Sequence, residues 1–297
     1  TDLTTFNSNQ NEDFTDFGLA ATANFPVARG SRLNGSVNLG YQRNTNANTL
    51  VNERLQTTTF SAGVGASYKL NRRMDLRTNL SFTDADRQNL PSETNYSVLT
   101  GIAFNEIIGQ VGGTLDYRFR LRDSDGQREL EETDHALLFG LTGELLPQNL
   151  FGKVDASLSF GFQSTNSTAA GEEDEQTLVF NGSIGWQARA RTYVTLSAAR
   201  DVELTPDEQS VTRTGFNLSV QQTFGAKTSG SIGASYSIDD FRTGREDTSY
   251  GFTAGFNYTC TRTWSANARY SYDTSDSTQQ LSNFDRQQAT IGLNARF

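Results

Sequence analysis

The sequence predicts an all-β fold, a transmembrane antiparallel up-and-down β-barrel of about 16 strands, with residues 1–297 forming a single domain. Two observations lead to this prediction. First, only 35% of the residues are hydrophobic and the mean hydropathy is −0.55, so no run of about 18 apolar residues exists to form a membrane-spanning helix. Second, apolar and polar residues alternate along most of the chain. This alternation gives each strand one face for lipid and one for a polar lumen.

The last nine residues alternate strictly and end on an aromatic side chain. Ala289, Ile291, Leu293, Ala295 and Phe297 occupy one face. This segment resembles the C-terminal strand of bacterial outer-membrane β-barrels, which typically ends in Phe and is read by the barrel-assembly machinery. The resemblance implies localisation in the outer membrane of a Gram-negative bacterium, with Phe297 as assembly signal. The implied partners are the assembly machinery, outer-membrane lipid and lipopolysaccharide.

About fifteen alternating segments can be counted, each near the 9 to 11 residues that a tilted membrane strand needs. Leu3 to Phe6 would supply a sixteenth strand and place both termini in the periplasm, whereas 14 or 18 strands would require merged or missed segments. Short turns and longer polar loops alternate between the strands, as periplasmic turns and extracellular loops do in such barrels. The expected short turns are Pro26 to Ser31, Asn71 to Arg73, Asn105 to Gly109, Pro147 to Gly152, Arg189 to Arg191, Gly225 to Thr228 and Thr259 to Arg262. The longest expected loops are Asn44 to Arg54, Arg122 to Asp134 and Asp273 to Asp285.

Charge follows the same division. The net charge is −9, and most acidic residues fall in the longer loops, while Arg72, Arg73, Arg189 and Arg191 are near short turns. One interpretation is solubility together with divalent-ion bridging to lipopolysaccharide. The other is an electric field that favours cations or a basic partner at the outer mouth.

Aromatic residues cluster near strand ends, which predicts two girdles at the membrane interfaces. The girdle candidates are Tyr41, Tyr68, Trp186, Tyr258, Trp264 and Tyr272.

The face expected to line the lumen is mostly Ser, Asn, Gln, Thr and Gly. A few charged residues interrupt it and are candidates for setting selectivity: Arg77, Arg118, Arg120, Arg213, Arg269, Arg296, Asp75 and Asp116. Rings of charge set ion preference in pores. These arginines are spread over many strands, however, so pairing with nearby carboxylates or exposure to water is the competing interpretation.

No catalytic residue, metal site or cofactor is expected. Cys260 is the single cysteine and His135 the single histidine, so Cys-based metal clusters are excluded and the histidine is expected to be a solvated surface residue. We therefore expect a non-enzyme, and no nucleic-acid partner.

A closed 16-stranded barrel with an empty lumen would leave a wide hole, and the loops are too short for one of them to fold inward as a constriction. We therefore expect the lumen to be narrowed by flattening, occupied by a partner, or used for a large polymer.

The segment from Thr195 to Thr205 resembles a stretch of β-barrel porins associated with exopolysaccharide and exosortase loci, which implies a role in polysaccharide export. Two function hypotheses remain open. The first is a porin-like channel that transports hydrophilic solutes or exported polysaccharide through its Ser/Asn/Gln/Gly-lined lumen. The second is a structural sheath that holds a periplasmic or lumenal protein partner, as in porin–cytochrome electron conduits.

Overall fold

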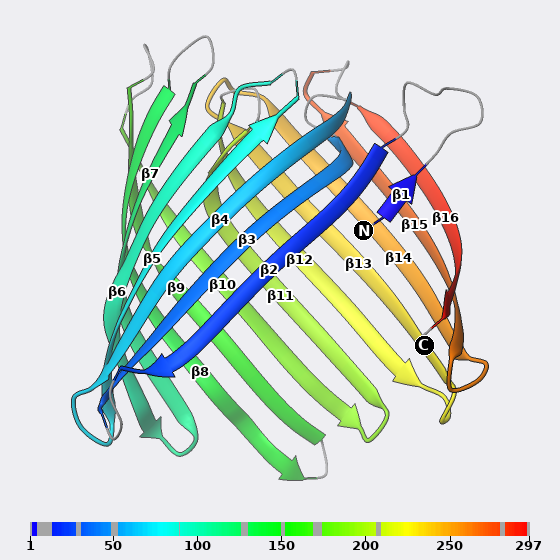
Figure 1. Ribbon diagram of the computed structural model, residues 1–297, viewed down its shortest axis with the longest axis horizontal. Coiled ribbons are helices and arrows are strands. Elements are labelled where there is room, and N and C mark those ends of the chain that lie inside the picture. The colour runs from blue at the N-terminus through cyan, green and yellow to red at the C-terminus, as the bar shows by residue number, and fades with distance from the viewer. Residues whose placement is uncertain are drawn as a thin grey trace.

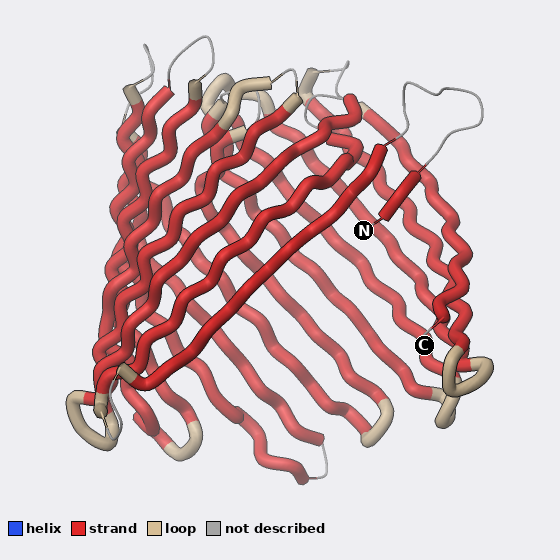
Figure 2. Tube along the Cα trace, viewed as in Figure 1, coloured by secondary structure: helices blue, strands red, loops and turns tan. Residues whose placement is uncertain are grey.

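The computed structural model describes residues 2–4, 14–27, 31–48, 53–88, 90–125, 130–149, 152–168, 174–205, 209–279 and 283–295. Within these residues the chain forms strands only (Figure 2). The strands are β1 (Asp2–Thr4), β2 (Phe14–Pro26), β3 (Leu33–Asn48), β4 (Glu53–Lys69), β5 (Met74–Arg87), β6 (Glu93–Ile108), β7 (Val111–Ser124), β8 (Leu130–Asn149), β9 (Gly152–Ser167), β10 (Glu175–Arg189), β11 (Thr192–Leu204), β12 (Ser210–Thr223), β13 (Thr228–Phe241), β14 (Glu246–Thr259), β15 (Trp264–Ser277) and β16 (Phe284–Ala295). None of the described segments is an apolar helix long enough to cross a membrane.

The strands follow one another around a curled sheet, each antiparallel to the next, in the order β1 to β16 (Figure 1). This confirms the predicted up-and-down antiparallel fold. Within the described residues no ladder joins β16 to β1 or β2, so the sheet curls into a barrel that these residues do not close. The short β1 pairs with the outer end of β2, Asp2 opposite Asp16. The described chain therefore starts at the end of the longer connections, not at the short-turn end as expected, and Phe6 lies outside the described residues.

The alternation of the sequence sets the two faces of the sheet. Side chains directly opposite each other in a ladder share a face, and the register pairs Leu196 with Leu218 and Phe216 with Tyr236. These apolar side chains point outward, where Leu196 is 47% and Leu218 44% exposed. Such exposure would be unfavourable in water and suits a surface covered by lipid.

The structure places turns close to the expected short turns, but β6 continues to Ile108 and β8 to Asn149, so the expected turns Asn105 to Gly109 and Pro147 to Gly152 began too early. Residues 28–30 and 150–151 lie outside the described residues. Elsewhere, β10 ends at Arg189 and β11 begins at Thr192, while β14 ends at Thr259 and β15 begins at Trp264. These turns gather at one end of the barrel, the lower end in Figure 1. We call the opposite end, where the longer connections lie, the outer end.

The expected strand lengths and loops were wrong at the outer end. Strands β2 to β16 contain 12 to 20 residues, because much of each expected loop continues the ladder. β3 runs to Asn48, and β8 already begins at Leu130. Polar strand ends lack the apolar alternation that marks a lipid-facing segment, yet their backbone groups still need hydrogen-bond partners. Acidic residues assigned to loops, including Asp123, Glu131, Glu132 and Asp134, consequently lie on strands.

The outer end of β11 separates from β10, while β12 stays paired with β13 to its outer end, Val211 opposite Phe241. The β10–β11 ladder ends at Phe180 opposite Arg200, although β10 begins at Glu175 and β11 continues to Leu204. Beyond this point β11 stays paired with β12. Alternation assigns Val202 and Leu204 to the outward face, but they are only 1% and 9% exposed. We name residues 201–204 and 210–213 the in-folded strand ends.

The in-folded strand ends pack against the inner face of the wall. The Val202 carbonyl oxygen accepts hydrogen bonds from Arg120 and Arg122 of β7, at 3.2 and 2.9 Å. On the inner face of β8 and β10, Ala136 and Val179 are 2% and 3% exposed. Burying a side chain such as Val202 contributes roughly 1.5–3 kcal/mol. The sheet therefore becomes two layers thick at the outer end of β7 to β12.

Candidate functional site

A cluster of buried polar side chains lies on the inner face of the barrel at the outer ends of β7 to β9. Its centre consists of three arginines on consecutive inward positions of β7. Arg118, Arg120 and Arg122 point to the same face because strand residues two apart do so. Their neighbour on β8 is Asp134, whose carboxylate accepts hydrogen bonds from Arg120 Nε at 3.0 Å and Arg122 Nη2 at 2.8 Å. Arg122 also forms an ion pair with Glu132 at 3.0 Å, and both side chains are almost completely buried. Buried charges of this kind persist only when they are paired.

A buried polar chain on β9 orients these guanidinium groups. Gln163 Oε1 accepts hydrogen bonds from Arg118 at 2.6 Å and Arg120 at 3.2 Å. Gln163 Nε2 donates to Thr165 at 3.0 Å, and the Thr165 hydroxyl donates to Asp134 at 2.6 Å. Gln163 and Thr165 are each 1% exposed. The arginines are therefore held in place by neighbours on their own wall.

Asp201 joins the in-folded strand ends to this cluster. Its two carboxylate oxygens accept from Arg118 at 3.1 and 3.3 Å and from Arg120 at 2.9 and 3.0 Å. Two guanidinium forks thus grip a single carboxylate, the strong bidentate form of this interaction. β7 and β11 are not neighbours in the sheet, so these bonds join the outer end of β11 to the inner face of a strand elsewhere in the wall.

The other predicted lumen residues do not assemble into one site. Arg77 on β5 pairs with Asp116 on β7, and Arg213 on β12 pairs with Asp239 and Glu203. Asp75 accepts a hydrogen bond from Asn105 at 3.2 Å. Arg269 is exposed and forms no ion pair with the described residues. Arg296 and Phe297 lie outside the described residues.

Several members of the buried cluster were not among the sequence candidates: Arg122, Glu132, Asp134, Gln163 and Asp201. Arg122 and Asp134 bound a segment that the sequence predicts as a loop. A signal that could have identified them is the alternation of Arg118, Arg120 and Arg122 along one strand. In the hairpin, Arg120 lies opposite Asp134 and Arg122 opposite Glu132. Nothing local to Asp201 indicates a partner more than 80 residues away.

The opposite wall is open and polar. A depression of about 390 Å³ on the inner face of β12 to β15 is lined by Ser219, Gln221, Asn257 and Arg269, among others. A second depression of about 450 Å³ lies beside it, on the other side of Arg269. Arg269 stands opposite Gly255 on β14 and Thr290 on β16, neither of which is charged. This wall presents mostly neutral hydrogen-bonding groups, together with the ion pair of Arg286 with Asp273 and with Arg269, which has no ion pair within the described residues.

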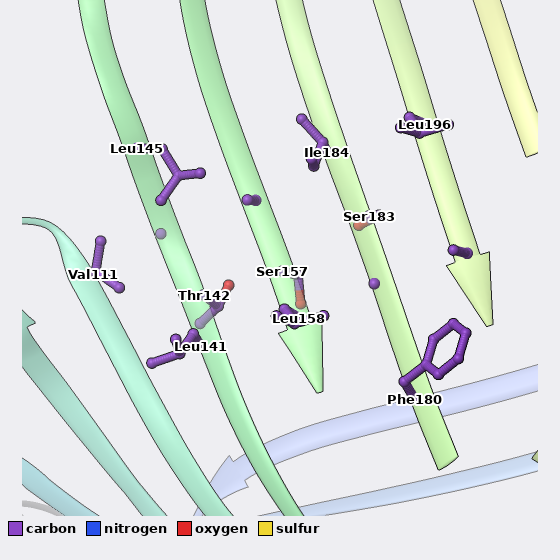
Figure 3. Close-up of a pocket in the computed structure, with 14 residues that line it drawn as sticks. Val111, Leu141, Thr142, Leu145, Ser157, Leu158, Phe180, Ser183, Ile184 and Leu196 are labelled. Carbon is purple, nitrogen blue, oxygen red and sulfur yellow. The ribbon is translucent and has the colours of Figure 1, made fainter. Parts of the chain in front are cut away.

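An apolar depression of about 400 Å³ lies across β8 to β11 (Figure 3). Leu141, Leu158 and Leu196 line it and belong to the outward face, where they are 44–47% exposed. It occurs where Gly143 and Gly182 provide no side chain. Its lining offers little to hydrogen-bond a hydrophilic solute, so it is not the candidate solute site.

The girdle candidates point outward at two levels. Tyr68, Tyr258 and Trp264 lie within a residue of the short-turn ends of their strands, with Trp186 nearby. Tyr41 and Tyr272 lie in the middle of β3 and β15. Tyr272 is eight residues beyond Trp264 on β15, roughly 26 Å along a strand at about 3.3 Å per residue. This spacing supports two girdles, with polar strand ends extending beyond the outer one.

The comparisons with known proteins agree with the fold. The family described as "Putative beta-barrel porin 2" matches residues 150–297. The FrpB iron transporter of Neisseria meningitidis, F3-3 variant, aligns with a TM-score of 0.59 and 9% identity over 94% of this chain and 57% of its own. The copper transporter OprC aligns with a TM-score of 0.56 and 9% identity over 94% and 56%. The alcaligin outer-membrane receptor FauA of Bordetella pertussis aligns with a TM-score of 0.51 and 9% identity over 93% and 56%.

The chain thus spans little more than half the length of these structures. No curated protein matches the chain significantly. The strand order, the lipid-facing exterior and these similarities define the class: a bacterial outer-membrane β-barrel. Within that class, residues 150–297 are similar to a porin family.

Proposed function

We propose that this protein is a non-enzymatic outer-membrane channel for hydrophilic solutes, narrowed at its outer end by the in-folded strand ends. The observation that carries the proposal is the contrast between the two faces of β12 to β16. Outward, large apolar side chains such as Phe252 and Phe256 are 43% and 47% exposed. Inward, the same strands present mostly Ser, Thr, Asn and Gln around two depressions, with Arg269, Asp273 and Arg286 as the charged lining residues. A polar surface of this extent is suited to water and dissolved molecules.

The chemistry of this wall favours sugars and similar solutes. Hydroxyl and amide side chains donate and accept hydrogen bonds without a fixed charge, so they exchange readily with the hydroxyl groups of a carbohydrate. A neutral lining binds weakly at many points, which allows a solute both to enter and to leave. We extend the proposal to exported polysaccharide as the largest solute of this kind.

The test is single-channel conductance of the purified, refolded barrel in a planar bilayer, with and without long-chain dextran. A stable conductance that dextran blocks supports a channel wide enough for a sugar polymer. A conductance that dextran leaves unchanged limits the proposal to small solutes. Absence of conductance from a folded barrel contradicts the channel and favours a sheath for a protein partner.

A further inference from the structure

We propose that Arg118 and Arg120 form a binding site for the carboxylate of an anionic solute, and that Asp201 occupies this site in the closed channel. A solute carboxylate that displaces Asp201 releases the in-folded strand ends and opens the outer end. This inference rests on the proposed channel function.

The site is built independently of its present occupant. Arg118 and Arg120 direct four N–H donors at Asp201, at 2.9 to 3.3 Å. Gln163, which is 1% exposed, accepts from both guanidinium groups, and Asp134 fixes Arg120 from the other side. If Asp201 moves away, these wall residues keep the two guanidinium groups close together. Paired guanidinium forks match the planar, bidentate geometry of a carboxylate.

The occupant lies where the strand can move. Asp201 is the first residue of β11 beyond its last pair with β10, Arg200 opposite Phe180. Past this point β11 has no ladder with β10 and is held to β7 by hydrogen bonds from arginine side chains, whereas β12 keeps its ladder with β13. The Asp201 side chain is also 32% exposed, so a solute in the lumen can reach the carboxylate.

The charges explain why the solute should be a carboxylate. Asp201 is the one carboxylate that forms an ion pair with Arg118 within the described chain, whereas Arg120 and Arg122 also pair with Asp134. Losing Asp201 without a replacement would leave the Arg118 guanidinium, whose side chain is 19% exposed, without a counter-charge. An uncompensated, largely buried charge is unfavourable. A solute carboxylate restores the balance, while a neutral sugar does not.

The experiment uses the full chain, refolded in lipid vesicles, with Cys260→Ser and Val202→Cys. Residue 202 is 1% exposed, so a maleimide should label it slowly. We expect 10 mM-range glucuronate to accelerate labelling about tenfold or more and glucose to have no effect, since charged hydrogen bonds of this kind shift an equilibrium by about that factor. Adding Asp201→Asn should give fast labelling without glucuronate and no further response.

Asp116→Asn is the matched control, because Asp116 is also a lumenal carboxylate held by an arginine, Arg77, but has no contact with the in-folded strand ends among the described residues. It should label slowly and respond to glucuronate. Equal labelling with glucuronate, glucose and buffer in a folded barrel would overturn the inference. Since labelling needs no ion flow, a glucuronate response in a barrel without conductance would contradict the channel and retain the binding site.

Discussion

The outer ends of β7 to β12 and the inner face of β13 to β16, the open wall, are built from the same alternating strands. They differ in how deeply their ion-paired side chains are buried. In the first region Arg120 and Asp134 are paired with side chains only 14% and 1% exposed. In the second, Arg286 and Asp273 pair across neighbouring strands while remaining 44% and 32% exposed. Arg120 also reaches Asp201 on β11, so the first pair lies between two layers, whereas the pair of Arg286 with Asp273 joins neighbouring strands only. Contact with a second layer, more than the presence of charge, therefore decides which ion pairs are buried.

Removing a buried cation should have the largest effect on stability. Arg122→Ala leaves Glu132 and Asp134, which are 0% and 1% exposed, without their shared partner. We expect the free energy of unfolding to fall by about 3–5 kcal/mol. Urea unfolding in lipid vesicles, followed by tryptophan fluorescence, measures this change. Arg269→Ala on the open wall is the control, and an equal loss in both variants would mean that burial of the cluster contributes nothing.

Apolar packing between the layers should come next. Val202 is 1% exposed on the in-folded strand ends, so Val202→Ala should cost about 2 kcal/mol through lost burial and the cavity left behind. Thr253→Ala, on the open wall, should change stability by less than about 0.5 kcal/mol. The same unfolding experiment compares the two. A neutral Val202→Ala variant would indicate that the layers are not in contact.

The exposed ion pair of the open wall should matter little. Arg286→Gln removes its 3.0 Å contact with Asp273, and exposed pairs contribute about 0–1 kcal/mol. Raising the salt concentration should erase even this difference. A loss comparable with that of Arg122→Ala would contradict the distinction between the two regions.

The smallest expected effect concerns ion preference. Arg269 has no ion pair within the described residues and lies between the two lumenal depressions, so its charge acts on passing ions. Arg269→Gln should shift the reversal potential in a salt gradient toward cation preference, while the double variant Arg77→Gln with Asp116→Asn, which removes a paired arginine together with its carboxylate, should shift it less because the net charge of the lumen is unchanged. The opposite order would show that pairing does not screen the lumenal arginines.

Much of the fold could be predicted from the sequence because its signals are local. Period-two alternation and the turn residues located the short-turn ends of β10 and β11 to within a residue or two. The outer strand ends were missed because Asn44 to Asn48 and similar segments carry no apolar alternation, although they continue the ladder. Their pairing depends on backbone hydrogen bonds, which the side-chain pattern does not report.

The candidate site could be predicted only in part. Arg118 and Arg120 were identified by their inward positions, but their partner Asp201 depends on how sharply the sheet curves between β7 and β11. Val202 illustrates the same limit, because alternation places it with the lipid-facing Leu196 while the structure buries it inside the barrel. Curvature arises from the whole sheet, so no local pattern could indicate these contacts.

The most direct measurement removes the in-folded strand ends and compares single-channel conductance with that of the full chain. Arg200 and Thr214 are directly paired across β11 and β12. Residues 201–213 can therefore be deleted and Arg200 joined to Thr214 through Asn-Gly, which closes the shortened hairpin with a two-residue turn. If the in-folded strand ends narrow the outer end, the shortened barrel will conduct more than the full chain. An unchanged conductance in a correctly folded barrel would contradict this account.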